Sequence, residues 1–374
     1  RDVLGSRGLG DVYKRQSYFF VFTILIFQMK KYSLPLEKLG IGFMPYLSLI
    51  VPVYNRPQEV QELLESLAAQ DSRDFEIIIV EDGSTVRCDR IVEQYKSAID
   101  IKYFFKENSG PGLSRNYGAE RAEGKYVVFL DSDCIIPRQY TQVVRQACQE
   151  AGVDAFGGPD RAHDSFTNIQ KAINYSMTSF FTTGGIRGQK QSMEKFHPRS
   201  FNMGFSQEVL KATGGFSGLR FGEDIDMSIR IMAAGFKTCL LPEAYVFHKR
   251  RTSFRKFFKQ VYNSGMARIN LYLLHPHSLK LVHFLPACFV IGCLLCLLGG
   301  IFFSWYCLLP LLLLIFVFFI DSWRLNKSIK VAFLSIVAAF IQLFAYGIGF
   351  IHAVFAALIL KRPVKGMFVR NFYK

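Results

Sequence analysis

The sequence lacks a cysteine pattern that would hold a disulfide framework or a structural zinc ion. Its eight cysteines show no regular spacing, and the single C-x-x-C, from Cys293 to Cys296, lies inside a hydrophobic run. We therefore interpret the cysteines of the first 250 residues as reduced thiols, which fits a domain in the cytoplasm. These are Cys88, Cys134, Cys148 and Cys239.

A dinucleotide fingerprint is also missing, which argues against a dehydrogenase. The glycine-rich segment from Gly5 to Gly10 does not match one and follows no predicted strand. We treat residues 1–44 as a separate N-terminal segment, and we interpret its leading part as a non-native remnant of cloning or sequence assembly. A poorly formed signal anchor around Tyr18–Phe27 is the alternative.

Acidic residues are fewer than basic ones, 30 against 45, which gives a formal net charge of +15. This charge could indicate nucleic acid, but its distribution favours membrane lipids as the partner and no nucleic acid. Basic residues beside hydrophobic spans usually mark the cytoplasmic side and meet anionic lipid. They precede the first long hydrophobic run and follow the last: Lys249, Arg250, Arg251, Arg255, Lys256 and Lys259, then Lys361, Arg362, Lys365, Arg370 and Lys374.

Long hydrophobic runs predict transmembrane helices and a basic tail over residues 283–374, since about 20 apolar residues cross a bilayer. Phe284–Ile320 is long enough for a pair of spans separated near Ser304. A third span over Val331–Leu360 would carry the basic tail across, against the positive-inside tendency. Either the final stretch bends back at Gly347 and Gly349 or the tendency is broken, and both readings stay open.

Residues 45–250 alternate between apolar strands and amphipathic helices, which predicts an α/β domain with a mainly parallel sheet covered by helices on both faces. Ligands bind beyond the carboxyl ends of such strands. Polar clusters follow three of the predicted strands there. The predicted strands are Leu47–Val53, Phe75–Val80, Ile101–Phe105 and Tyr126–Leu130.

The motifs at these strand ends resemble those of the family 2 glycosyltransferases, which have the Rossmann-like GT-A fold. They are Leu-Ile-Val-Pro-Val-Tyr-Asn at residues 49–55, Glu-Asp-Gly-Ser-Thr at 81–85 and Asp-Ser-Asp at 131–133. The resemblance extends from Tyr46 to His248. It implies transfer of a sugar from a nucleotide-sugar donor, a UDP-sugar being favoured, with inversion at the anomeric carbon.

The resemblance also implies which residues bind the donor. Asp82 would read the nucleoside, although a carboxylate before Gly83 could simply stabilise a turn. Arg115 could bind a phosphate with two hydrogen bonds, or it could stabilise its own loop through hydrogen bonds, and both readings stay open. The full expected set is Pro52, Tyr54, Asn55, Asp82, Gly83, Arg115, Asn116, Asp131 and Ser132.

A divalent metal, Mn²⁺ or Mg²⁺, is the expected cofactor. Asp131 and Asp133 are alternate carboxylates after an apolar strand, and such a pair can share a hard cation that also bridges a diphosphate. The resemblance adds His248 as a third ligand, against the alternative of a structural histidine. Cys134 stands where many relatives carry a further Asp.

Glu223 and Asp224 stand where a helix is predicted to begin. Carboxylates there can simply cap the helix and complement its dipole. The resemblance instead implies that Asp224 is the catalytic base that takes a proton from the acceptor hydroxyl, with Glu223 as the second candidate.

Residues 251–282 are expected to form a basic amphipathic helix and linker, which could lie in the membrane interface or pack on the α/β domain. No Gln-x-x-Arg-Trp signature follows Gln260, which favours a non-processive enzyme. We expect the acceptor to be lipid-linked or a surface polysaccharide at the cytoplasmic membrane, with the catalytic domain facing the cytoplasm. The alternatives are transfer to a polyprenyl phosphate and a non-catalytic nucleotide-sensing membrane protein.

Overall fold

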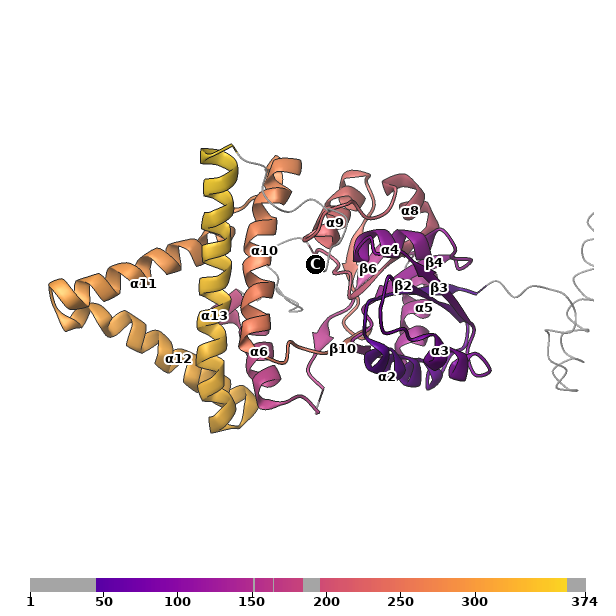
Figure 1. Ribbon diagram of the computed structural model, residues 1–374, viewed down its shortest axis with the longest axis horizontal. Helices are drawn as coiled ribbons and strands as arrows, with labels where there is room; N and C mark the ends of the chain where they lie inside the picture. Colours follow the sequence, from indigo (N-terminus) through magenta and orange to yellow (C-terminus); the bar gives the residue numbers. More distant parts are fainter. Residues whose placement is uncertain (1–44, 151, 164, 184–195, 362–374) are drawn as a thin grey trace, which may run out of the picture. The chain divides into compact units, whose positions relative to one another are not determined.

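The computed structural model describes residues 45–150, 152–163, 165–183 and 196–361. The predictions for residues 1–44 and for the basic tail beyond Lys361 therefore lie outside the described residues. A seven-stranded sheet forms the centre of the α/β domain (Figure 1), and only β8 runs antiparallel to its neighbours within it. Its order is β3 (Ile101–Lys106), β2 (Phe75–Asp82), β1 (Leu47–Val53), β4 (Tyr126–Leu130), β8 (Asn202–Ser206), β6 (Ala155–Gly157) and β9 (Thr238–Leu240).

Alternating side chains of the strands enter two hydrophobic clusters, one on each face of the sheet. Leu49 and Val51 of β1 pack with α2 (Pro57–Ala68), α3 (Asp89–Tyr95) and α5 (Tyr140–Glu150). Ile50 points to the other face, where α4 (Pro111–Ala119), α8 (Gln207–Thr213) and α9 (Glu223–Ala233) lie. Each such buried side chain contributes about 1.5–3 kcal/mol. The predicted α/β fold with helices on both faces is confirmed.

A second, three-stranded sheet brings distant parts of the chain together beside the end of β4. It contains β5 (Cys134–Ile135), β10 (Val246–His248) and β7 (Asp160–Arg161). Within it His248 lies opposite Cys134. The histidine is therefore held next to the Asp-Ser-Asp motif by backbone pairing.

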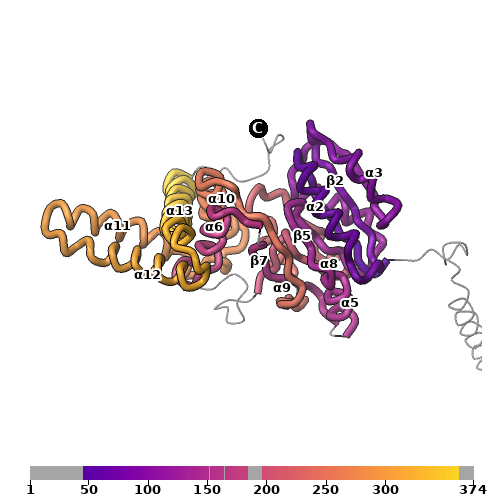
Figure 2. Tube along the Cα trace, turned by 90° about the horizontal axis from the view of Figure 1, so that it is seen from below, coloured from indigo at the N-terminus to yellow at the C-terminus, as the bar shows by residue number. Residues whose placement is uncertain are grey.

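The helical region begins after β10. It contains α10 (Phe254–Leu274), α11 (Leu285–Phe302), α12 (Leu309–Asn326) and α13 (Ile329–Val354), with shorter turns between them. Three segments are long and apolar enough to cross a membrane, among the described residues: Leu281–Phe302, Trp305–Asn326 and Ile329–Ile359. Figure 2 shows α10, α13 and α6 (Asn168–Thr178) grouped together.

Of the two readings left open by the sequence, a bend at Gly347 and Gly349 is wrong, because α13 continues through both. The glycines instead allow two other helices to approach closely. A Cβ at Gly347 would lie 2.3 Å from the carbonyl oxygen of Pro286 in α11, and one at Gly349 would lie 2.2 Å from that of Tyr262 in α10. Small residues serve this purpose at helix contacts in membranes.

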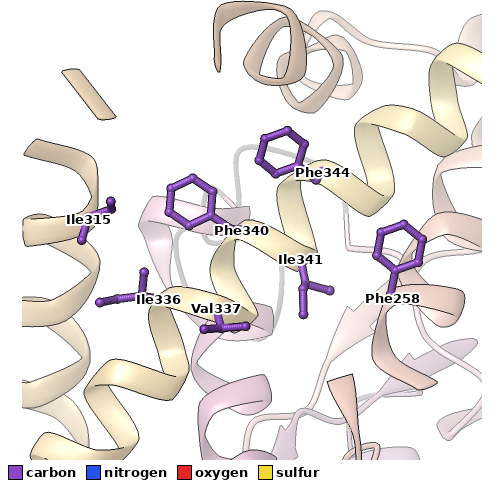
Figure 3. A pocket seen from close by; sticks show the side chains of 7 residues that line it. All are labelled: Phe258, Ile315, Ile336, Val337, Phe340, Ile341 and Phe344. Carbon is purple, nitrogen blue, oxygen red and sulfur yellow. The ribbon is translucent and has the colours of Figure 1, made fainter. Parts of the chain in front are cut away.

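An apolar groove of about 500 Å³ crosses α13. Figure 3 shows Ile315 of α12 on one side of it, Phe258 of α10 on the other, and aromatic and aliphatic side chains of α13 between them. Those from α13 are Ile336, Val337, Phe340, Ile341 and Phe344.

Candidate active site

The turn after β1 is fixed by Asn55, which has a positive φ of 53°. Its side-chain oxygen accepts hydrogen bonds from the backbone N–H groups of Thr85 and Val86, at 2.8 and 3.0 Å. Asn55 therefore ties the end of β1 to the loop after β2. Pro52 lies one residue before the end of β1, and Tyr54 lies in the turn itself.

Asp82 is the last residue of β2, and its carboxylate is buried. One oxygen accepts from the Ser109 N–H and the other from the Gly110 N–H, both at 2.8 Å, and Lys106 Nζ lies 2.5 Å away. These bonds fix the loop that leads into α4. Gly83 is required next to it, since its φ is +74° and a Cβ there would lie 2.7 Å from the Asn108 nitrogen.

Arg115 of α4 joins two groups of carboxylates. It is buried, and its guanidinium donates to Asp131 Oδ1 at 2.9 Å and to Glu223 Oε1 at 3.2 Å. Burial by itself lowers the pKa of Arg115, but the charges of Asp131 and Glu223 outweigh it and hold that pKa above its usual value. Glu223, 108 residues away in the chain, is thus brought to the end of β4.

The neighbouring residue Asn116 has a different function in the fold. Its amide donates to the Phe216 carbonyl and accepts from the Phe216 N–H, both at 2.8 Å. These two bonds hold the Gly214–Gly215–Phe216 turn against α4. The side chain is therefore occupied by backbone groups in this structure.

Asp133 is paired with two side chains, those of His248 and Arg56. His248 Nε2 lies 3.1 Å from Asp133 Oδ1, and Arg56 Nη1 contacts Oδ2. Burial raises the pKa of Asp133, but His248 and then Arg56 more than offset this and hold the pKa well below its usual range. Ser132, between the two aspartates, is buried.

His248 is fixed by its surroundings. Its ring stacks on Phe201 with centroids 5.0 Å apart, and Nε2 lies 3.8 Å from Asp131 Oδ2 as well as close to Asp133. The other ring nitrogen, Nδ1, is buried and has no hydrogen-bond partner in the part of the chain that the structure describes. Both aspartates of the motif therefore face one imidazole.

Two overlapping sets of side chains could hold a metal ion here. Ligand atoms of Asp133, Cys134 and His248 lie within 4.8 Å of one another. Burial raises the pKa of Cys134 well above its usual value, so this thiol stays protonated and is a poor ligand for a hard cation. Asp131 and Asp133 with His248 form the donor set better suited to Mn²⁺ or Mg²⁺.

Glu223 and Asp224 are the first residues of α9, after Gly222 with a φ of +83°. Burial, and next the charge of Asp224, raises the pKa of Glu223 to about 7. Asp224 Oδ1 accepts from the Ile225 N–H at 2.8 Å, and Arg199 lies 3.5 Å from its other oxygen. Oδ2 of Asp224 therefore has only a long contact, with Arg199, and it lies next in the chain to Glu223, which pairs with Arg115.

The structure joins five of the predicted residues into one contiguous set of contacts. His248 connects Asp133 to Asp131, and Arg115 connects Asp131 to Glu223, the neighbour of Asp224. Asp82 is linked to this set only through the loop that enters α4.

Sequence reasoning missed three residues of this network: Arg56, Arg199 and Phe201. Arg56 had a detectable signal, because it directly follows Tyr54 and Asn55 at the end of a predicted strand. Arg199 and Phe201 had none, since they lie in no motif and reach the site only through folding.

Comparison with known proteins shows which sequences and folds this chain is similar to. Residues 48–214 match the family model described as "Glycosyl transferase family 2". Glycosyltransferase AglE of Haloferax volcanii is 26% identical over 266 residues, 67% of this chain and 81% of AglE. The GalNAc(5)-diNAcBac-PP-undecaprenol beta-1,3-glucosyltransferase of Campylobacter jejuni is 34% identical over 117 residues, 30% of this chain and 38% of its own length. Three longer glycosyltransferases of Rickettsia are matched over 23% of their length or less.

Among solved structures, the mannosyltransferase PcManGT from Pyrobaculum calidifontis, in complex with GDP-Man and Mn²⁺, superposes with a TM-score of 0.58. It is 16% identical, and the alignment covers 83% of this chain and 88% of PcManGT. This likeness concerns the fold. Residues 48–214 therefore match family 2 of the glycosyltransferases, in a domain with the GT-A fold, and three apolar helices long enough to cross a membrane follow that domain.

Proposed function

We propose that the chain is an inverting, metal-dependent transferase that moves a sugar from a nucleotide-sugar to a hydroxyl of a lipid-linked or surface-polysaccharide acceptor. The observation that supports this best is the double contact of Arg115 with Asp131 and Glu223. Through this contact Arg115 connects Asp131, which we propose as a metal ligand, to Glu223, which is the neighbour of the proposed base Asp224. A transferase needs both in one place, because its donor and acceptor react there.

Mn²⁺ or Mg²⁺ would be held by Asp131, Asp133 and His248. Two carboxylates and an imidazole suit such a cation, and in this structure Arg115 and Arg56 balance the same negative charge. The ion would offset the charge that develops on the departing diphosphate. PcManGT, whose fold is similar, was solved with Mn²⁺ and GDP-Man, which supports this cofactor.

Asp224 would accept the proton of the acceptor hydroxyl. As the acceptor oxygen bonds to the anomeric carbon, the bond from that carbon to the diphosphate oxygen breaks on the opposite face, so the configuration inverts. Arg115, which lies between the two groups of carboxylates, would stabilise the phosphate charge. Glu223 shares its guanidinium and would help to position it.

A lipid-linked acceptor is consistent with the apolar helices that follow the domain. A catalytic domain that faces the cytoplasm is consistent with the free cysteines. The Campylobacter relative is named for a substrate linked to undecaprenol, which supports the same class of acceptor. Transfer to a polyprenyl phosphate is the alternative. A phosphate acceptor is already deprotonated and would need no base at Asp224.

The test is release of nucleoside diphosphate by the purified full chain with lipid extract as acceptor. UDP-, GDP- and dTDP-sugars are supplied in turn with Mn²⁺ or Mg²⁺, UDP-sugars being the expected donors. We expect metal-dependent release from one class. Absence of release from every donor, under conditions in which the chain is folded and membrane-bound, would reject the proposal.

A further inference from the structure

The longest apolar helix, α13, lies beside a helix that is too polar to cross a bilayer. A Cβ at Gly265 of α10 would lie 2.3 Å from the Tyr346 carbonyl oxygen of α13. One hydrophobic cluster joins Phe257 of α10 to Ala338 of α13, and a second joins Ile269 to Ala353. The two helices therefore run alongside each other in the same direction, as Figure 1 also shows.

α10 cannot follow α13 through hydrocarbon. It has 21 residues but is not among the membrane-span candidates of the described chain. It carries four charged residues, three at its start and one in its second half: Arg255, Lys256, Lys259 and Arg268. A charge at the bilayer centre costs about 2.5–3.5 kcal/mol or more.

Both ends of α10 are also fixed to the α/β domain. Just before the helix, the buried Arg250 pairs with Asp160 of β7 and donates to Asn174 of α6. Just after it, His275 Nε2 lies 2.8 Å from Asp226 of α9. The α/β domain requires water, so both ends of α10 lie on one side of the membrane.

The first half of α13 is covered by the α/β domain in the same way. Ala172 and Ile173 of α6 share a hydrophobic cluster with Val331 of α13. At the end of α12, Asp321 accepts from the Tyr175 hydroxyl at 3.0 Å. α13 thus contacts water-requiring elements from Val331 to Ala353.

We infer that α13 does not cross the membrane but lies along its surface, and that only the α11–α12 hairpin inserts. The apolar segment Ile329–Ile359 has 31 residues, about 46 Å of helix, whereas the hydrocarbon core is about 30 Å thick. A helix of this length that crossed the membrane would have to tilt, kink or thicken the bilayer, whereas a helix that lies in the interface would not.

The hairpin has the composition of an inserted element. Residues 284–320 contain no charged side chain. α11 packs on the second half of α13 through Gly347 and Pro286, and α12 packs on the first half through Ser322 and Ser335. The two helices converge at a turn where Phe303 is 87% exposed. Both ends of the hairpin therefore start from the same surface.

Lipid fits the outer face of α13. Phe333, Val337 and Ile348 are exposed there, and the groove of Figure 3 has only apolar side chains around it. Exposed Arg255, Lys256 and Lys259 at the start of α10 provide charges for anionic headgroups. Hydrocarbon chains and headgroups of one leaflet would thus contact the same surface of the protein.

This arrangement removes the conflict with the positive-inside tendency. If α13 stays in the interface, Lys361 and the basic residues after it lie on the side of the α/β domain. Neither a bend in α13 nor a translocated basic tail is required.

The side of Lys361 can be measured by cysteine labelling of the full chain in sealed membrane vesicles of both orientations. Three variants are compared, each with one introduced cysteine: Glu93→Cys, Lys330→Cys and Lys361→Cys. The half-buried Cys239 and the cysteines of α11 and the turn after it are replaced by alanine, and the cysteines that remain are buried. All three positions are exposed. Glu93→Cys reports the α/β domain, and Lys330→Cys reports the loop before α13.

We expect a membrane-impermeant maleimide to label all three from the same face. Labelling of Lys361→Cys from the face opposite to Glu93→Cys would overturn the inference. An epitope fused after Lys374 tests the same point without a substitution. We expect protease to remove the epitope only from the face on which Glu93→Cys is labelled. Removal only from the opposite face would also overturn the inference. Neither result depends on sugar transfer.

Discussion

The α/β domain and the helical region are held together by different kinds of contact. At the strand ends, Asp131, Asp133, Arg115 and His248 form directional polar contacts between buried and half-buried groups. In the helical region, glycines allow backbones to approach and apolar side chains fill the space. A charge removed from the first region changes chemistry, whereas a methyl group added to the second changes packing.

The largest expected effect is that of Asp133→Asn on turnover. The substitution keeps the shape of the side chain but removes the charge that faces His248 and Arg56. We expect a loss of about a thousandfold or more in nucleoside diphosphate release, in line with removal of a metal site. The far-ultraviolet circular dichroism spectrum should not change. Asp71→Asn, at an exposed ion pair, serves as the matched control and should keep wild-type turnover.

Asp224→Asn should reduce transfer by about a hundredfold to ten-thousandfold if the acceptor is a hydroxyl, since this is the usual contribution of a general base. The donor affinity should be nearly unchanged, because the role proposed for Asp224 concerns the acceptor. The measurement is kcat and KM for the donor. Full turnover in the variant would instead support a phosphate acceptor.

Gly349→Leu should destabilise the helical region by about 1–3 kcal/mol, because its side chain would collide with the Tyr262 carbonyl of α10. Thermal unfolding in detergent measures this change. The matched variant is Gly292→Leu in α11, where a Cβ meets nothing within 4 Å. Equal melting temperatures for the two variants would contradict the close packing of α10 on α13.

The smallest expected effect concerns pH. Burial and Asp224 raise the pKa of Glu223 from its ordinary 4.5 to about 7. Between these values the folded chain keeps a proton that the unfolded chain has lost, so the stability from this group is lost as pH rises through about 7. The melting temperature of Glu223→Gln, relative to that of the wild type, should therefore be higher at pH 8 than at pH 5. A difference that is the same at both pH values would show that Glu223 does not titrate in this window.

Much of the α/β domain could be predicted from the sequence because its signals are local. The apolar strands and the polar residues after them follow one another in the chain, and β1 to β4 were found this way. β6, β8 and β9 were missed, since strands such as Ala155–Gly157 are too short to show a pattern. Arg199 was missed because only the folded chain brings it to Asp224.

The helical region shows the same limit in another form. Hydropathy correctly located the apolar segments, but it cannot tell a helix that crosses a membrane from one that lies along it. The direction of α13 depends on its contacts with α6 and α10, which join residues far apart in the chain. A bend at Gly347 and Gly349 stayed open as a reading of the sequence because their partners, Pro286 and Tyr262, are identified only in three dimensions.

Transfer of radiolabelled sugar is the most direct test of the proposed site. Membranes containing wild-type chain, Asp133→Asn or Asp71→Asn would be supplied with the active donor and Mn²⁺, and label in the lipid-extractable and polymer fractions would be counted. We predict incorporation by wild type and Asp71→Asn, its loss after chelation of the metal, and none above background for Asp133→Asn. Equal incorporation by all three, with or without chelator, would contradict the assignment.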